Sequence, residues 1–254
     1  MRSLLAFGAL AMFAAPLGAL AAGEAPAKIM RSLVYQVTYS AHSSHERKTS
    51  GLDSGYGGAE STAHGGVSGG SATAGVGLDG ADTGLLTIDV IAATADGGLV
   101  VDASYSGRLS SQPKLRVALF ADGRLSADPK VTLGTAALHI LPLLARGFVA
   151  NRDVSPGSSW TIAAPPPARG STTYRVSSLD GEQATIALDG SLSVPGVTGF
   201  EETDRGTTKY ATNLLSPVSY DINARIRRQL AIDESVTTEA HLTATLVSDT
   251  FAKK

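Results

Sequence analysis

The chain has 254 residues, no cysteine and a formal net charge of −2, with 43% hydrophobic and 6% aromatic residues. A chain without cysteine has no disulfide, no thiolate nucleophile and no thiolate metal ligand, and the near-neutral charge predicts no binding to nucleic acid. The apolar residues are largely Val, Leu, Ile and Ala that alternate with polar residues, a pattern typical of antiparallel sheets with one covered face.

The first residues have the order of a secretory signal peptide. Arg2 precedes an apolar run over 4–13, Pro16 and Gly18 interrupt the apolar sequence, and small residues follow as far as Ala21. This order of charge, apolar stretch and small-residue cleavage site predicts a signal peptide over 1–21. Because the interrupted run is too short to span a bilayer, we expect export to the periplasm or the medium, without a transmembrane segment in the mature chain.

The remaining sequence predicts one β-rich domain with a single interruption. Residues 22–50 start the domain with a strand whose alternate residues from Leu33 to Tyr39 share one apolar face. Residues 51–84 are rich in glycine and have almost no bulky apolar side chain, so they bury too little surface to offset their backbone entropy. We predict a flexible Gly-rich loop or insertion there, and residues 85–254 complete the same domain.

Turn signals divide that last part into hairpins and one helical segment. The glycines of Asp-Gly-Gly at 96–98 and of Asp-Gly at 180–181 suit tight turns and predict a β-hairpin around each. Residues 131–149 instead have apolar residues three and four apart, which predicts a helix that Pro142 kinks or divides. The fold class is therefore mainly β: a curved antiparallel sheet or half-barrel with one packed apolar helix.

Two matches to catalytic fingerprints occur inside the Gly-rich segment. Residues 66–70 fit G-x-S-x-G around Ser68, and residues 75–80 fit G-x-G-x-x-G. A nucleophilic serine elbow needs a strand before it and a helix after it, and a dinucleotide loop needs a strand before it and a helix that starts within it. The sequence predicts neither context, so we interpret both as chance matches and expect no catalytic residue and no cofactor.

Histidine offers further candidate chemistry. His42, His45 and His64 with Glu46 have side chains that suit zinc or copper. His42 and His45 are three residues apart, which places them on opposite faces of a strand, so we interpret the group as a solvated polar edge and predict no bound metal. His139 lies within the apolar helical segment, and we expect it to be a packed, hydrogen-bonded core residue.

The stretch RDVSPGSSW, from Arg152 to Trp160, forms a turn that leads from the helix into a strand with the only tryptophan. Together with early strands before it and hairpins and a long terminal pair after it, this layout resembles uncharacterised exported β-rich bacterial proteins. More distantly it resembles the periplasmic lipoprotein-carrier half-barrels. The resemblance covers about residues 30–250 and implies a curved sheet that wraps a helix and encloses an apolar ligand.

Many alternating strands and one apolar helix must share a concave core, and concave apolar sites are where ligands usually bind. We therefore expect an exported, non-enzymatic protein that binds a hydrophobic small molecule or lipid, with Trp160, Leu141, Leu144 and Phe148 as the candidate pocket residues. Three alternatives stay open: a core filled by its own side chains, a structural component of the bacterial envelope that contacts an envelope protein, and an enzyme whose site residues lie far apart in sequence.

Overall fold

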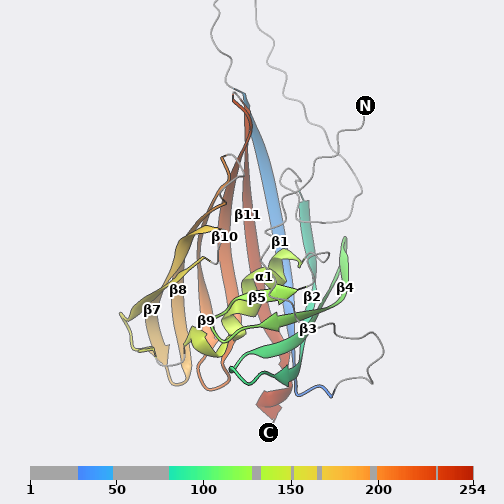
Figure 1. Ribbon diagram of the computed structural model, residues 1–254, viewed down its shortest axis with the longest axis vertical. Helices are drawn as coiled ribbons and strands as arrows, with labels where there is room; N and C mark the ends of the chain where they lie inside the picture. The colour runs from blue at the N-terminus through green and yellow to red at the C-terminus, as the bar shows by residue number, and fades with distance from the viewer. Residues whose placement is uncertain are drawn as a thin grey trace, which may run out of the picture.

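The computed structural model describes residues 28–47, 80–127, 133–149, 152–164, 168–194, 199–232 and 234–253. Within these ranges, eleven strands form one antiparallel sheet that curves without closing, as the sequence predicted (Figure 1). The strands are β1 (Arg31–Arg47), β2 (Gly80–Ala93), β3 (Leu99–Gly107), β4 (Ser111–Leu119), β5 (Leu125–Ala127), β6 (Ser159–Ala163), β7 (Arg169–Asp180), β8 (Gln183–Ser193), β9 (Glu201–Ala211), β10 (Ser216–Ala231) and β11 (Glu234–Asp249).

The strand order places the first and last strands in the middle of the sheet. The order is β5-β4-β3-β2-β1-β11-β10-β9-β8-β7-β6, so β1 pairs with β11. The first half of the chain is a meander that runs outward to the short edge strand β5, and the second half is a meander that runs inward from the short edge strand β6. The chain then crosses from the edge strand β5 to the edge strand β6 over the concave face of the sheet (Figure 1). This crossing segment contains the helical residues.

The crossing segment is a divided helix. The α-helix α1 has only six residues, Thr135–Ile140, and the 3₁₀ turns η1 (Leu141–Leu144) and η2 (Arg146–Phe148) follow it, while a further 3₁₀ turn, η3 (Thr250–Lys253), follows β11. Pro142 has no backbone N–H and cannot continue an α-helix, so the predicted division occurs at η1. The single helix predicted over 131–149 is thus a short helix with two 3₁₀ turns.

Hydrogen bonds fix this segment over one part of the sheet. At its start the Gly134 N–H donates to the side-chain oxygen of Gln112 in β4, at 2.9 Å. In the middle the hydroxyl of Tyr210, from β9, donates to the carbonyl of Leu143 at 2.9 Å, and further on the Gly147 N–H donates to the Ala121 carbonyl at 2.7 Å. The segment is therefore bound to both halves of the sheet.

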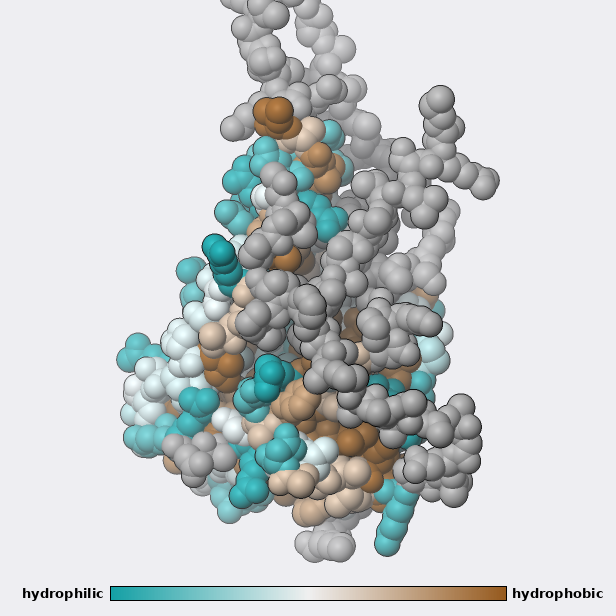
Figure 2. All heavy atoms as spheres, viewed as in Figure 1, coloured by the Kyte–Doolittle hydropathy of each residue, from teal (hydrophilic) through white to brown (hydrophobic). Residues whose placement is uncertain are grey.

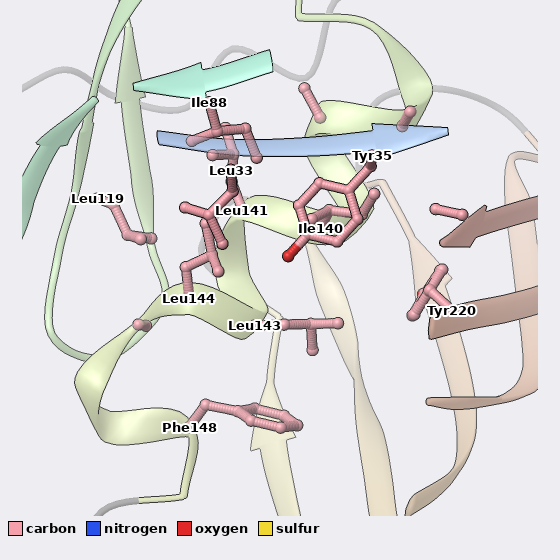
Figure 3. Close-up of a cluster of buried hydrophobic side chains, with 14 of the residues drawn as sticks. Leu33, Tyr35, Ile88, Leu119, Ile140, Leu141, Leu143, Leu144, Phe148 and Tyr220 are labelled. Atoms are coloured by element: carbon pink, nitrogen blue, oxygen red, sulfur yellow. The ribbon is translucent and has the colours of Figure 1, made fainter. Parts of the chain in front are cut away.

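The hydrophobic core lies between this segment and the sheet. Figure 3 shows Leu33 and Tyr35 of β1 pointing toward Ile140 and Leu141 of the crossing segment, and all four side chains are at most 1% exposed. The strand side chains point to this face at every second position, as the alternation predicted. In Figure 2 hydrophobic residues gather around the crossing segment, whereas the flank over β7 and β8 is neutral to hydrophilic.

The two predicted hairpins are confirmed, and one predicted loop boundary is wrong. Gly97 and Gly181 have positive φ, +84° and +57°, in the turns between β2 and β3 and between β7 and β8. Strand β2 begins at Gly80, so residues 80–84 of the predicted loop belong to the sheet, while residues 51–79 and the predicted signal peptide, 1–21, lie outside the described residues. A Cβ on Gly84 would lie 2.4 Å from the Gly107 Cα, so glycine there permits close approach of two strands.

In the ranges that the structure describes, no helix is long and apolar enough to cross a membrane.

Candidate functional site

The register of the sheet divides its concave face into rows, because residues that pair across strands point to the same side. One row contains Tyr39, Leu242 and Ile222, from β1, β11 and β10, and these residues belong to the hydrophobic core or pack against it. This row is the upper limit of the continuous core cluster on these three strands, although Val236 is also buried further along β11. The strands continue beyond it toward the end where β1, β10 and β11 converge (Figure 1).

Two further rows, which we call the upper rows, lie on the concave face beyond the core. None of their apolar members belongs to the core cluster of the described residues. The first row comprises, from β1 to β7, Ala41, Ala240, Ala224, Asp204, Gly190 and Thr172. The second row comprises, in the same strand order, Ser43, Thr238, Ile226, Glu202, Leu192 and Gly170.

The first upper row consists largely of small side chains. Three neighbouring strands contribute alanine at this level, and β8 contributes Gly190. An alanine projects only one methyl group from the sheet, whereas the core row below carries Tyr39, Leu242 and Ile222. Most side chains of the first upper row therefore project less far from the sheet than those of the core row beside it.

Each upper row holds one carboxyl group. Glu202 and Asp204 are two residues apart on β9, so both point to the concave face. Burial raises the pKa of Asp204 to about 6, and burial together with the nearby Asp204 charge raises the pKa of Glu202 to about 7. These shifts place both groups close to the point of ionisation at neutral pH, because a poorly solvated site disfavours the charged form.

The hydroxyl groups of three tyrosines lie near these carboxyl groups. Burial raises the pKa of Tyr174 to about 12, with a further contribution from Asp204, and burial together with Glu202 raises that of Tyr39. Burial also raises the pKa of Tyr220, whose hydroxyl lies 3.4 Å from Nδ1 of His139. All three phenols keep their protons at neutral pH.

His139 is the imidazole of the crossing segment. It is half-buried on α1, and burial lowers its pKa to about 4, so the ring is neutral at pH 7. Its contact with the Tyr220 hydroxyl agrees with the packed, hydrogen-bonded position expected from the sequence.

The four pocket residues expected from the sequence lie in the core below the upper rows. Leu141, Leu144 and Phe148 are 0%, 5% and 2% exposed, and Trp160 is 9% exposed. Phe148 packs edge-on against Trp160 and Tyr174, with ring centres 5.6 and 4.9 Å away. The structure therefore brings the crossing segment and Trp160 together as neighbours, and their assignment to a ligand pocket stays a prediction.

His42 and His45 lie apart in the structure, as the strand geometry predicts. His42 pairs with Glu239 and His45 with Val236 in β11, so the two side chains occupy opposite faces of β1. His64 and Ser68 lie outside the described residues. Within the described ranges, no three His, Asp or Glu side chains are placed to hold a metal ion together.

A charged pocket lies on the opposite face of the sheet. It has a volume of about 260 Å³. Glu201 and Arg227 contribute to it, and these residues alternate along their strands with Glu202 and Ile226 of the upper rows. Its lining residues are Glu46, Gly199, Glu201, Arg227, Gln229, Ile232, Glu234 and Ser235.

Sequence reasoning did not identify Glu202 and Asp204 as site residues. Their segment, EETDRGTTKY, has a polar residue at almost every position, and only the last, Tyr210, is a large buried side chain. Counting back from Tyr210 in steps of two reaches Asp204 and Glu202, so the strand period was the available signal.

Comparison with known proteins identifies no relative by sequence. No family model matches the chain, and no curated protein matches it. Among solved structures, one described as lipid–protein interactions in lipovitellin aligns with 87% of this chain and 25% of its own, at 12% identity and a TM-score of 0.45. The chain thus spans about a quarter of that protein's length, and a similarity of this size identifies neither a ligand nor an activity.

Proposed function

We propose that the protein is an exported, non-enzymatic carrier that binds a hydrophobic ligand or lipid on the upper rows. The supporting observation is the position of these rows: a concave, mostly apolar or small-residue surface that lies beyond the hydrophobic core on the same strands. Ligand sites are usually concave and lined by apolar side chains with a few polar groups. Ile226 and Leu192 supply apolar area here, and the two carboxyl groups of β9 supply the polar groups.

The crossing segment supports this function by leaving the upper rows outside the core. Its described contacts are with the lower part of the sheet, through Tyr210, Tyr220 and the ring cluster around Phe148. A ligand on the upper rows would rest against the core row on one side. Such a site needs no opening of the packed core.

Extraction of the purified protein tests ligand binding directly. Protein purified without detergent is extracted with organic solvent, and the extract is analysed by mass spectrometry. We expect an apolar molecule in the extract, and a change in the fluorescence of Trp160 when fatty acids or phospholipids are added. Trp160 is the only tryptophan, and it stacks on Tyr174, a neighbour of Asp204, at a ring distance of 5.8 Å. A clean extract together with unchanged fluorescence would contradict the proposal.

Export has its own test. The order of residues over 1–21 predicts cleavage between Ala21 and Ala22. We expect the intact mass of protein recovered from the periplasm or medium to start at Ala22. A recovered protein that still contains Arg2 would contradict cleavage at this site and leave ligand binding unaffected.

A further inference from the structure

Asp204 is half-buried and, unlike the buried aspartates, has an oxygen without a partner among the described residues. Its Oδ1 atom is fully buried and accepts no hydrogen bond from any described residue. Asp89 and Asp102 are paired with Lys114 and Arg116 at 2.9 Å, and Asp249 is paired with Arg31. More than nine in ten buried polar groups in proteins are hydrogen-bonded, so an unpaired carboxylate oxygen on a concave face indicates a position that a donor from outside the chain occupies.

A second unpaired polar atom lies beside the same rows. The side chain of Trp160 is only 9% exposed, and its indole N–H has no acceptor among the described residues. Trp160 lies on the concave face of β6, where the next residue on that face, Ile162, pairs with Thr172 of the first upper row. The first upper row thus contains one unsatisfied acceptor, Oδ1 of Asp204, and one unsatisfied donor, the indole N–H of Trp160, belongs to the neighbouring row.

The charges around the rows select the kind of head group. Asp204 and Glu202 form no ion pair with a described Lys or Arg side chain. Arg228, the next residue on this face of β10 beyond Ile226, already has a contact of its own. A phosphate or carboxylate placed here would face two carboxyl groups, and like charges at close range in a poorly solvated site are strongly unfavourable.

We infer that the upper rows bind an amphiphile whose head group is an ammonium that donates hydrogen bonds to Asp204 and Glu202, while its apolar chain lies over Ala224, Ala240 and Ile226. This specificity rests on the proposed function, because it names the chemistry of the ligand at that same site. Carboxylates accept charge-assisted hydrogen bonds from an ammonium group, and these are about twice as strong as neutral ones.

Three probes of equal chain length test the head-group preference. Dodecylamine, dodecanol and dodecanoate are each titrated against the full chain at pH 8, with displacement of a neutral fluorescent naphthylamine as the readout. We expect dodecylamine to bind at least tenfold more tightly than dodecanoate, with dodecanol between them. In Asp204→Asn, which keeps the shape of the side chain, the ratio between amine and carboxylate is expected to fall by about tenfold.

Matched control variants separate the site from general surface charge. Asp189→Asn removes an exposed carboxyl from β8, and Glu201→Gln removes one from the opposite face of β9, next to Glu202. Both controls should keep the wild-type ratio. Equal binding of all three probes, or an unchanged ratio in Asp204→Asn, overturns the head-group inference while the proposed function stands. Failure of the naphthylamine and of every probe to bind overturns the proposed function itself.

Discussion

The lower and upper parts of the concave face are built from the same strands and differ in what their side chains do. The lower part carries large apolar residues that meet the crossing segment, and Leu33, Tyr35 and Leu141 are completely or almost completely buried there. The upper part carries alanine, glycine and two carboxyl groups that form no ion pair with a Lys or Arg side chain of the described ranges. Long strands therefore allow one end of a sheet to stabilise the fold while the other end presents a surface.

The same contrast exists between two carboxyl groups, those of the buried Asp82 and the half-buried Asp204. Burial raises the pKa of Asp82, but hydrogen bonds from Ser110, the Leu109 and Thr83 N–H groups and Tyr105 outweigh burial and lower the pKa overall. Asp204 lacks such donors, and its pKa is raised. A carboxyl group that serves the fold is thus recognised by its donors, and one without donors is a candidate for ligand contact.

The largest expected effect is in the lower part. Leu141→Ala should lower the free energy of unfolding by about 3 kcal/mol, because a fully buried leucine loses its packing and leaves a cavity. Leu230→Ala, in an exposed position on β10, should change the same quantity by less than about 0.5 kcal/mol. Urea denaturation measures both. Equal effects would mean that the crossing segment does not close the core as described.

The second prediction concerns Asp82. Asp82→Ala should lower the free energy of unfolding by about 2 kcal/mol, since it leaves the Leu109 N–H and the Ser110 hydroxyl without their acceptor. Thermal and urea unfolding at pH 7 measure this loss. A wild-type value for the variant would show that these donors are satisfied equally well by water.

Ionisation of Asp204 should make the free energy of unfolding fall as pH rises. The pKa of Asp204 is raised from its usual value to about 6, so the folded state binds more protons than the unfolded state between pH 4 and pH 6. This group therefore stabilises the fold below its unfolded pKa and loses that contribution as pH rises through 6. Relative to Asp204→Asn, the wild type should lose about 2 kcal/mol of stability between pH 4 and pH 7.

The comparison with the variant is needed because other groups titrate in the same window. The pKa of His139 is lowered to about 4, so its contribution to the stability of the fold increases as pH rises. The contribution of Glu202 decreases as pH rises, as that of Asp204 does. The tyrosines that face the pair keep their protons throughout. A difference between wild type and Asp204→Asn that stays constant from pH 4 to pH 7 would contradict the raised pKa.

The smallest expected effect on stability is in the upper rows. Ala224→Leu places a larger side chain in the first upper row and should change the free energy of unfolding by less than about 0.5 kcal/mol, while it weakens binding of apolar ligands about tenfold. If side chains of the protein already filled this space, the same substitution would cost about 1 to 3 kcal/mol through overpacking. Urea denaturation and probe titration of one preparation distinguish the two cases.

Local signals in the sequence predicted the parts of the fold that depend on few residues. The turn glycines at 97 and 181 and the break at Pro142 act within a few residues of themselves, and the structure contains each of them. Gly84 shows the limit of such signals. Glycine serves a flexible segment and a close strand contact equally well, and only the position of Gly107 in the neighbouring strand distinguishes them.

The candidate site could not be predicted because it depends on register. Ala41, Ala224 and Asp204 belong to strands that lie far apart in the chain, and they share a row only because β1, β11, β10 and β9 are neighbours in a particular alignment. Each strand taken alone shows which residues share a face. No single strand shows which residues of its neighbours lie beside them.

The pairing of β1 with β11 has a consequence for the kinetics of folding. Each meander can form from hairpins of neighbouring strands, but the contact between Arg31 and Asp249 closes a separation of 218 residues. Contacts of such long range make folding slow. Until the two strands meet, β1 and β11 each expose an unpaired edge, and such edges invite association with other chains. The centre of the finished sheet is therefore the part of the molecule most exposed to misassembly while it forms.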